Sequence, residues 1–244
     1  MRTIVRVLFL ATITALFTSA CSIHTKDSII ASKNYISKNV KVESFSGLKS
    51  EIVGNITYTQ SPTSSVEIYG PDNIVALINV EVNHNTLVIT MKDKKKIRKA
   101  EKLKIMVSSP SLSQITSKGV GDITLEGNIN SETLDITQEG VGDIVANSLN
   151  YKNIKVVSKG VGDVKLGGTS NNTEYNLYGV GDINAYNLKS DYVKAHLKGV
   201  GNLHCYAIQS IDAESKGVGN IKFKGKPGAR NLSKKGVGKI REVN

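Results

Sequence analysis

The sequence predicts an all-β protein whose C-terminal half is a parallel β-solenoid (a β-helix) with coils of about 20 residues. Apolar and polar residues alternate with a period of two, which is typical of strands with one buried face. Glycine is abundant at 22 residues and proline is scarce at 4, without the Gly-X-Y period of collagen. The strongest observation is a tripeptide, Gly-Val-Gly, that recurs every 18 to 21 residues, beginning at Gly119, Gly140, Gly160, Gly179, Gly199, Gly217 and Gly236. Only two cysteines are present, which excludes a disulfide scaffold.

Residues 1–20 have the layout of a lipoprotein-type signal peptide. Arg2 and Arg6 give a positively charged N-terminal region. A short, mostly apolar run without charge follows, and small residues precede Cys21. A cysteine directly after the cleavage site resembles the lipobox of bacterial lipoproteins, so we predict that Cys21 is lipidated. Thr18 stands where that motif prefers leucine. Secretion without a lipid and an uncleaved anchor are the alternatives.

The mature chain is predicted to be basic and tethered to a membrane through its N-terminal lipid. Residues 21–39 are polar, lack a regular pattern and are interpreted as the tether. The formal net charge is +11, and loss of Arg2 and Arg6 with the signal peptide leaves +9. Such a surface could bind anionic lipids, acidic glycans or nucleic acid. An exported protein seldom meets nucleic acid, and no aromatic stacking platform is evident, so nucleic acid is not expected as a partner.

Residues 40–112 are predicted to be an N-terminal β region that forms either the first coils or a cap. Alternation is strong at Ile52, Ile56 and Tyr58, among other sites, and Asn83–Asn85 is predicted to be a turn between two strands. A cap would serve a purpose, because the open end of a solenoid exposes strand edges that invite aggregation.

Residues 113–244 contain the repeats, and each repeat cannot bury its apolar face alone. Stacking lets every strand pair in parallel with its equivalent in the next coil, which buries one continuous core. Counted from the first glycine of each copy, the apolar positions lie four residues before it and four and six residues after it. The latter two sets are Ile123, Ile144, Val164, Ile183, Leu203, Ile221 and Ile240, and Leu125, Ala146, Leu166, Ala185, Cys205 and Phe223. The set before the glycine is Ile115, Ile136, Val156, Tyr175, Ala195, Ala213 and Leu232.

The glycines are predicted to form tight corners, where a positive φ is adopted at little cost only by glycine and where a side chain would crowd the coil. An acidic residue follows each of the first four corners. The predicted turn and ladder residues are Gly119, Gly121, Asp122, Gly140, Gly142, Asp143, Gly160, Gly162, Asp163, Gly179, Gly181 and Asp182.

These motifs resemble the head GIN domain family (putative auto-transporter adhesin). The resemblance rests on the pattern G-V-G-D-I-T-L-E-G, on L-D-I-T-Q-E-G-V-G-D-I-V-A-N-S-L, and on upstream segments such as V-K-V-E-S-F-S-G-L-K-S, and it runs from about Val40 to Ile240. It implies a β-helix similar in shape to pectin lyases but without their catalytic residues. It also implies a lipoprotein at the outer surface of Gram-negative bacteria, with an adhesive role.

The column of acids after the corners allows three interpretations. Asp and Asn side chains accept hydrogen bonds from turn amides, and such bonds can be repeated in every coil. The alternatives are Ca²⁺ binding, which needs six to eight oxygen ligands, and an acid pair for glycoside cleavage, whose retaining form needs carboxyl groups about 5–5.5 Å apart. The column offers few other oxygens and no asymmetry, so no metal, no cofactor and no catalytic residue is predicted.

The central valines form either an exposed ridge or a buried row. Strict alternation places them outside, as a contact ridge for a partner or a second copy. If the corner interrupts the alternation, the valine side chains would instead point inward. They are Val120, Val141, Val161, Val180, Val200, Val218 and Val237. The residue before each corner is lysine in five of the seven copies: Lys118, Lys159, Lys198, Lys216 and Lys235. These lysines form either a solvated edge or a basic ridge for anionic glycans.

The sequence therefore favours a non-enzymatic cell-envelope lipoprotein, anchored in the outer membrane at the cell surface, that acts as a structural or adhesive module. Its surface ligand, a protein or a glycan, is not specified. The alternatives are a binder of acidic glycans or other envelope polyanions and, less favoured, a polysaccharide-active enzyme. Cys205 lies in the inward register and is predicted to be a buried, inert thiol. His196 and His204 could approach each other on neighbouring coils, but no third metal ligand is evident.

Overall fold

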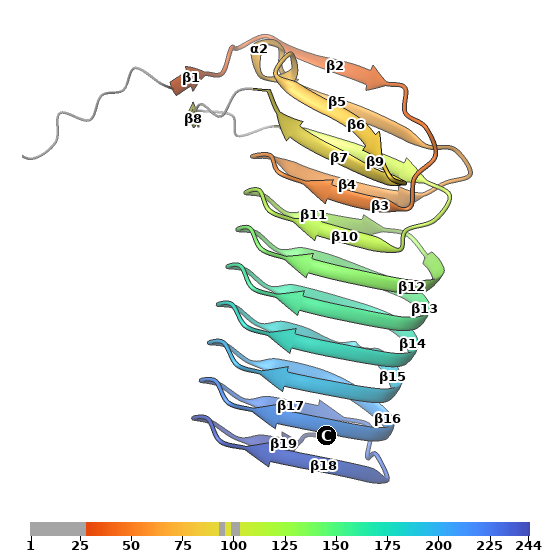
Figure 1. Cartoon of the computed structure of the whole chain (residues 1–244), viewed down its shortest axis with the longest axis vertical. Coiled ribbons are helices and arrows are strands. Elements are labelled where there is room, and N and C mark those ends of the chain that lie inside the picture. Colours follow the sequence, from red (N-terminus) through yellow and green to blue (C-terminus); the bar gives the residue numbers. More distant parts are fainter. Residues whose placement is uncertain (1–27, 93–95, 99–102) are drawn as a thin grey trace, which may run out of the picture.

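In a computed structural model that describes residues 28–92, 96–98 and 103–244, the protein is a stack of flat coils with a broader β layer at its N-terminal end (Figure 1). The prediction of an all-β parallel solenoid is confirmed. The predicted signal peptide and Cys21 lie outside the described residues. Within the described ranges, no helix is long and apolar enough to cross a membrane.

Each coil consists of a strand before the corner, the Gly-Val-Gly corner and a strand after it. Consecutive coils pair in parallel and in register, so Ile115 lies opposite Ile136, and Ile123 lies opposite Ile144. We call the two resulting layers the pre-corner sheet and the post-corner sheet. The strands are β10 (Gln114–Ser117), β11 (Ile123–Glu126), β12 (Ile129–Gln138), β13 (Ile144–Ser158), β14 (Val164–Leu177), β15 (Ile183–Leu197), β16 (Leu203–Ser215), β17 (Ile221–Lys224), β18 (Ala229–Lys234) and β19 (Ile240–Glu242). From β13 to β16, one bent strand runs from each corner to the next.

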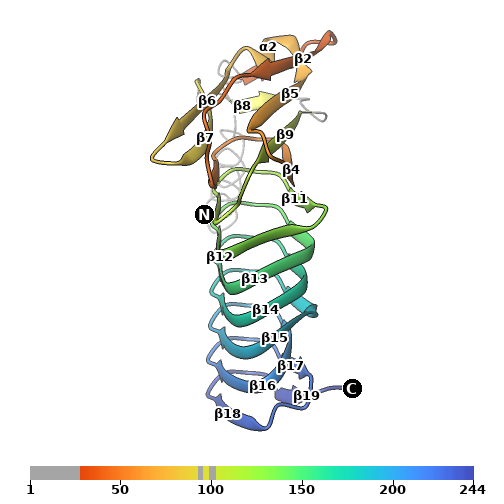
Figure 2. The ribbon, with the colours of Figure 1, turned by 90° about the vertical axis from the view of Figure 1, so that its right-hand side faces the viewer.

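The N-terminal region supplies both a coil and a β layer above it. Strands β3 (Gly47–Ser50) and β4 (Asn55–Gln60) pair in parallel with β10 and β11 and so form a coil of the solenoid. Strands β7 (Thr86–Met91) and β9 (Lys104–Ser109) pair in parallel with β3 and β4 on the other side. Figure 2 shows the antiparallel layer beyond them, in which β2 (Tyr35–Val40) pairs with β5 (Ser65–Pro71), β5 with β9, and β6 (Ile78–Asn83) with β7.

A short helix and a separate two-stranded sheet were not predicted, whereas one turn was. Residues Asp72–Val75 form the short helix α2 directly after Pro71, and its apolar side buries Ile74 and Val75. Strand β1 (Ser28–Ile30) pairs in parallel with β8 (Lys96–Arg98). The predicted turn at Asn83–Asn85 is confirmed, because His84 and Asn85 have positive φ angles of 48° and 61° between β6 and β7.

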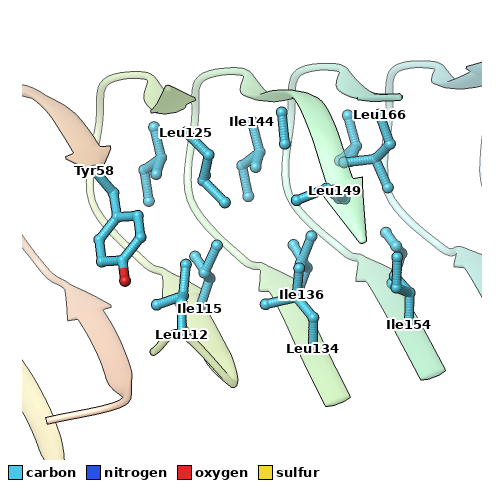
Figure 3. Close-up of a cluster of buried hydrophobic side chains, with 14 of the residues drawn as sticks. Tyr58, Leu112, Ile115, Leu125, Leu134, Ile136, Ile144, Leu149, Ile154 and Leu166 are labelled. Atoms are coloured by element: carbon cyan, nitrogen blue, oxygen red, sulfur yellow. The ribbon is translucent and has the colours of Figure 1, made fainter. Parts of the chain in front are cut away.

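The core lies between the pre-corner and post-corner sheets and continues without a break into the N-terminal coil. Figure 3 shows its side chains meeting in layers, with Ile115 and Ile136 from one sheet facing Leu125 and Ile144 from the other. Tyr58 joins the N-terminal coil to this core, and its hydroxyl is within 2.9 Å of the hydroxyl of Ser109.

The inward register is confirmed, and the last coil keeps it, but burial there is incomplete. Leu232 is 44% exposed and Ile240 is only partly buried. The physical reason is that both residues lie in the final coil, which has a neighbouring coil on one side only. No further layer of side chains covers the apolar residues of β18 and β19.

The corners explain why glycine recurs, although the two glycines act differently. Only the second glycine of each copy has a strongly positive φ, as at Gly162 (135°). A Cβ on the first glycine would collide with backbone: at Gly160 it would lie 2.1 Å from the carbonyl oxygen of Gly140. The crowding is therefore between successive corners and not inside the coil.

Replacement of Gly160 by valine should destabilise the protein by more than about 3 kcal/mol, since the clash involves backbone that cannot rotate away. Urea unfolding monitored by circular dichroism measures this loss. The matched control is Gly228→Val, because a Cβ at Gly228 meets nothing within 4 Å. Equal midpoints for Gly160→Val and the parent chain would show that the corner assignment is wrong.

Candidate functional site: the repeated corner and the basic end

The acids after the corners form a hydrogen-bonded ladder along the post-corner side. The backbone amide of Asp163 donates to Oδ1 of Asp143 at 2.8 Å, and the amide of Asp182 donates to Oδ1 of Asp163 at 2.9 Å. The same bond joins each neighbouring pair from Asn55 in the N-terminal coil to Lys239 in the last. In each coil of the ladder, one carboxylate or amide oxygen therefore accepts a hydrogen bond from a backbone amide of the next coil.

The hydrogen bond from the backbone affects the pKa of one ladder residue, Asp143. The amide of Asp163 lowers the pKa of Asp143, partial burial opposes this, and Lys165 at 3.1 Å lowers the pKa further. Lys165 also lies 3.5 Å from Asp163, so it bridges two rungs. Within the described part of the chain, no group of three or more His, Cys, Asp or Glu residues is placed to hold a metal ion. The arrangement supports the interpretation of the acids as turn acceptors.

The central valines lie outside, each about half exposed, and form one uninterrupted column. Their backbones pair from coil to coil as single parallel bridges, from Val120 to Val237. The column begins one coil earlier than the sequence indicated, because Val53 pairs with Val120. This eighth corner, Ile52-Val53-Gly54, escaped the sequence analysis because isoleucine replaces its first glycine. We call these eight residues the valine ridge: Val53, Val120, Val141, Val161, Val180, Val200, Val218 and Val237.

The lysines before the corners line one side of the valine ridge, and we call this column the lysine flank. Glu139 interrupts it and pairs with Lys118 at 3.1 Å and with Lys159 at 3.5 Å. Lys198 lies 5.4 Å from the centre of the Tyr178 ring. A shallow groove runs between the flank and the ridge and is lined by Lys159, Gly160, Val161, Tyr178, Gly179, Val180, Lys198, Gly199, Val200, Lys216, Gly217 and Val218.

Within the solenoid, the excess of positive charge lies in the last coils, which the sequence analysis did not localise. Residues 201–244 contain nine Lys and Arg and three Asp and Glu, whereas residues 113–200 contain eight and ten. On the outer face of the post-corner sheet, Lys222 lies opposite His204 on one side and Arg241 on the other. No described carboxylate lies within ion-pair distance of either cation or of Lys224.

Two aromatic rings accompany these cations. The ring of Tyr186 stacks on His204 at 4.7 Å with an interplanar angle of 3°, and Lys224 lies 5.2 Å from the centre of the Tyr186 ring. Burial and the nearby Lys222 lower the pKa of His204, and Asp182 opposes them, so the neutral imidazole is favoured. We call Tyr186, His204, Lys222, Lys224 and Arg241 the basic cluster.

A polar groove crosses the outer face of the pre-corner sheet. Its lining includes Asp135, Lys155, Glu174, Lys194 and Asp212, which alternate in sign from coil to coil. Lys155 and Glu174 lie 3.6 Å apart. Because neighbouring charges neutralise one another, this groove offers no uniform field for an ion or a polyanion.

The remaining chemically reactive residues are separated or buried. The prediction that Cys205 is buried is confirmed, and burial raises the pKa of its thiol to about 12, which disfavours the reactive thiolate. His196 lies opposite Asn176 and Glu214 on the pre-corner sheet, whereas His204 lies on the post-corner sheet. The structure therefore does not bring the two histidines together.

Comparison with protein families identifies the family of this chain through residues 44–227. This segment matches the family described as "Putative auto-transporter adhesin, head GIN domain". The chain belongs to the head GIN domain family. The family predicted from the Gly-Val-Gly-Asp repeats is thus confirmed, and with it the similarity to proteins described as putative adhesins.

Solved structures of other bacterial proteins show the same fold. A putative adhesin of Bacteroides fragilis is 46% identical, with a TM-score of 0.86 over 88% of this chain and 100% of that one. A protein of Parabacteroides distasonis described as a putative lipid binding protein is 21% identical, with a TM-score of 0.73 over 89% and 100%. A putative adhesin of the same species is 22% identical, with a TM-score of 0.68 over 89% and 100%. The latter two share the fold only. No curated protein matches this chain.

Replacement of Asp143 by alanine should cost about 1 kcal/mol at neutral pH, since it removes one hydrogen bond from a corner amide. Asp143→Asn should cost less, because Asn202 already accepts the same bond in its coil. Urea unfolding at pH 7 measures both losses. Equal stability of Asp143→Ala and the parent would contradict the role of the ladder.

The same variants test the effect of protonation. The pKa of Asp143 is lower in the folded than in the unfolded chain, so its contribution is complete above the usual carboxyl pKa and is lost as the pH falls through the folded value. The stability difference between the parent and Asp143→Asn should therefore shrink as the pH is lowered from 7 toward 2. A difference that stays constant over this range would contradict the assignment.

Proposed function

We propose that this head GIN domain is a non-enzymatic module of the bacterial cell surface, anchored in the outer membrane through a lipid on Cys21 and used for adhesion. The observation that carries the proposal is the 46% identity, over almost the whole chain, to a protein described as a putative adhesin. The family description supports the same role. A lipid at the N-terminal end would leave the stacked coils projecting away from the membrane, as a stiff rod with repeated columns of side chains.

The chemistry of the described residues supports a binding role over catalysis. The ladder carboxylates hold corner amides, so they are committed as hydrogen-bond acceptors in the resting structure. Cys205 is buried, and burial raises the pKa of its thiol, which disfavours a nucleophilic role. The groove beside the valine ridge exposes repeated, similar positions, and each of Asp135, Glu174 and Asp212 in the polar groove lies opposite a lysine. Neither groove shows the two carboxyl groups in contrasting environments that acid–base catalysis requires.

Surface display is tested with bacteria that export the full chain or its Cys21→Ser variant. The parent should fractionate with membranes, be removed from intact cells by added protease and increase retention of the cells on a mucin-coated surface. Cys21→Ser should lose membrane association and retention, because no acyl chain holds it. Resistance of the parent to protease on intact cells, with digestion only after lysis, would contradict an outward-facing adhesin.

Binding of acidic polysaccharides is a second candidate function, and the basic cluster favours it. Lys222, Lys224 and Arg241 are not neutralised by described carboxylates, and Tyr186 and His204 provide stacked rings beside them. Sugar rings pack on aromatic faces, and carboxylates or sulfates on the sugar pair with Arg and Lys. The cluster lies toward the C-terminal end, away from the N-terminal anchor that we propose.

Replacement of Lys222, Lys224 and Arg241 by glutamine should lower the salt concentration at which the chain elutes from a heparin or polygalacturonate column. The matched control is Lys33→Gln, Lys38→Gln and Lys41→Gln, which removes the same charge from exposed sites near the N-terminus. Equal shifts in both variants would indicate a nonspecific charge effect and would contradict a site at the basic cluster. Absence of retention of the parent at 50 mM salt would also contradict it.

A further inference from the structure

The polar groove on the outer face of the pre-corner sheet is a concave surface to which the proposed function gives no role. Its volume is about 610 Å³, which is within the range of ordinary ligand sites. It extends over five successive coils, from Asp135 to Asp212, or roughly 19 Å at about 4.8 Å per coil. A groove of this length suits an elongated ligand that lies along the solenoid axis.

Hydrogen-bond donors and acceptors alternate along the polar groove. One column of side chains is acidic and basic in turn from coil to coil, as described above. The parallel column, two residues earlier in each strand, is Thr133, Asn153, Asn172, Tyr192 and Ser210. Asn172 donates to Asn153 at 2.9 Å. The side-chain nitrogen of Asn153 and the side-chain oxygen of Asn172 then have no partner among the described residues, so both can bond to a ligand.

Tyr192 provides an aromatic ring within this polar lining. Its side chain is 48% exposed, and its hydroxyl donates to Gln209 at 2.9 Å. This hydrogen bond orients the ring before any ligand binds, so little side-chain entropy is lost when the ring makes a contact. The groove therefore combines one oriented apolar face with polar groups on the neighbouring coils.

The charges of the groove select the class of ligand. Its two lysines and three acids give a net charge of −1, which disfavours a polyanion. The core of a protein–protein interface is depleted in charged residues and enriched in aromatic and apolar ones, whereas this groove is lined mainly by polar side chains. A neutral ligand rich in hydroxyl groups fits better, because each hydroxyl both donates and accepts a hydrogen bond.

We propose that the polar groove binds a neutral, linear oligosaccharide along the solenoid axis, with one sugar packed on Tyr192 and its neighbours bonded to Asn172 and Asn153. The apolar C–H face of a sugar ring packs on an aromatic face, and its hydroxyls bond to amide and carboxylate side chains. Each further coil presents another pair of polar side chains to the next sugar. As the ligand of an adhesin, this glycan rests on the proposed function, whereas the binding site itself does not.

Binding of the purified chain to neutral glycans tests the proposal. All proteins are full-length exported chains with Cys21→Ser, so neither lipid anchoring nor surface display affects the result. The immobilised probes are mannan, mixed-linkage β-glucan and mucin from which sialic acid and sulfate have been removed, with untreated mucin as the acidic comparison. Surface plasmon resonance at about 50 and about 500 mM salt measures affinity and its ionic component. Thermal unfolding confirms that each variant is folded.

Three tyrosine variants locate the site. Tyr192→Ser removes the ring and should weaken binding to a neutral probe about tenfold. Tyr192→Phe keeps the ring and should retain most of the affinity. The matched control is Tyr178→Ser, because Tyr178 is 43% exposed and lies beside the lysine flank, outside the polar groove. This control should bind like the parent.

The parent should bind at least one neutral probe with an affinity that hardly changes with salt, because no ion pair with the ligand is involved. Failure to bind any neutral probe would overturn the proposal, and so would equal affinities of Tyr192→Ser and the parent. Binding to untreated mucin alone, abolished by salt, would also overturn it, although the adhesive function would still stand. Glycan binding that depends on Tyr192 in a chain that is not displayed on cells would contradict the proposed function alone.

Discussion

The close contact between successive corners is the constraint on which the rest of the structure depends. At Gly160 a Cβ would lie 2.1 Å from a carbonyl oxygen of the preceding corner, and at Gly162 it would lie 2.3 Å from another. Backbone therefore meets backbone at every corner, and the next coil has little freedom to shift or rotate. Identical positions consequently form straight columns, which is why a ridge, a flank and a ladder can exist on this surface.

The ends of the stack show what happens where this contact is absent. At the N-terminal end, the Ile52 corner contacts a further corner on one side only, so a side chain is tolerated there, and β7 and β9 continue the two sheets into an antiparallel layer. At the C-terminal end, the last coil leaves Leu232 and Val237 exposed. Lysine and arginine are concentrated there, and charges on an open strand edge discourage pairing with other chains. The basic cluster can therefore serve solubility as well as recognition.

The repeat made most of the solenoid predictable, because an interval near 20 residues with fixed apolar positions allows one arrangement of coils. Residues without a repeated neighbour were less predictable. The corner at Ile52 was missed because it lacks the first glycine, and α2 was missed because four residues after Pro71 carry no helical period. The orientation of the valines could not be decided from alternation alone, because a corner can interrupt the alternation of inward and outward side chains. The basic cluster combines Tyr186 with residues one, two and three coils away, and its members meet only through the register of the coils.

Hydrogen–deuterium exchange of the corner amides tests the central claim most directly. Val141, Val161 and Val180 each donate to the carbonyl of a glycine in the preceding corner, at 3.0 Å. The account predicts slow exchange at these amides, with protection that decreases toward Val237 in the last coil. Exchange of the internal corner amides as fast as that of exposed loop amides would contradict it, because the corners would then not be held together by the backbone of their neighbours.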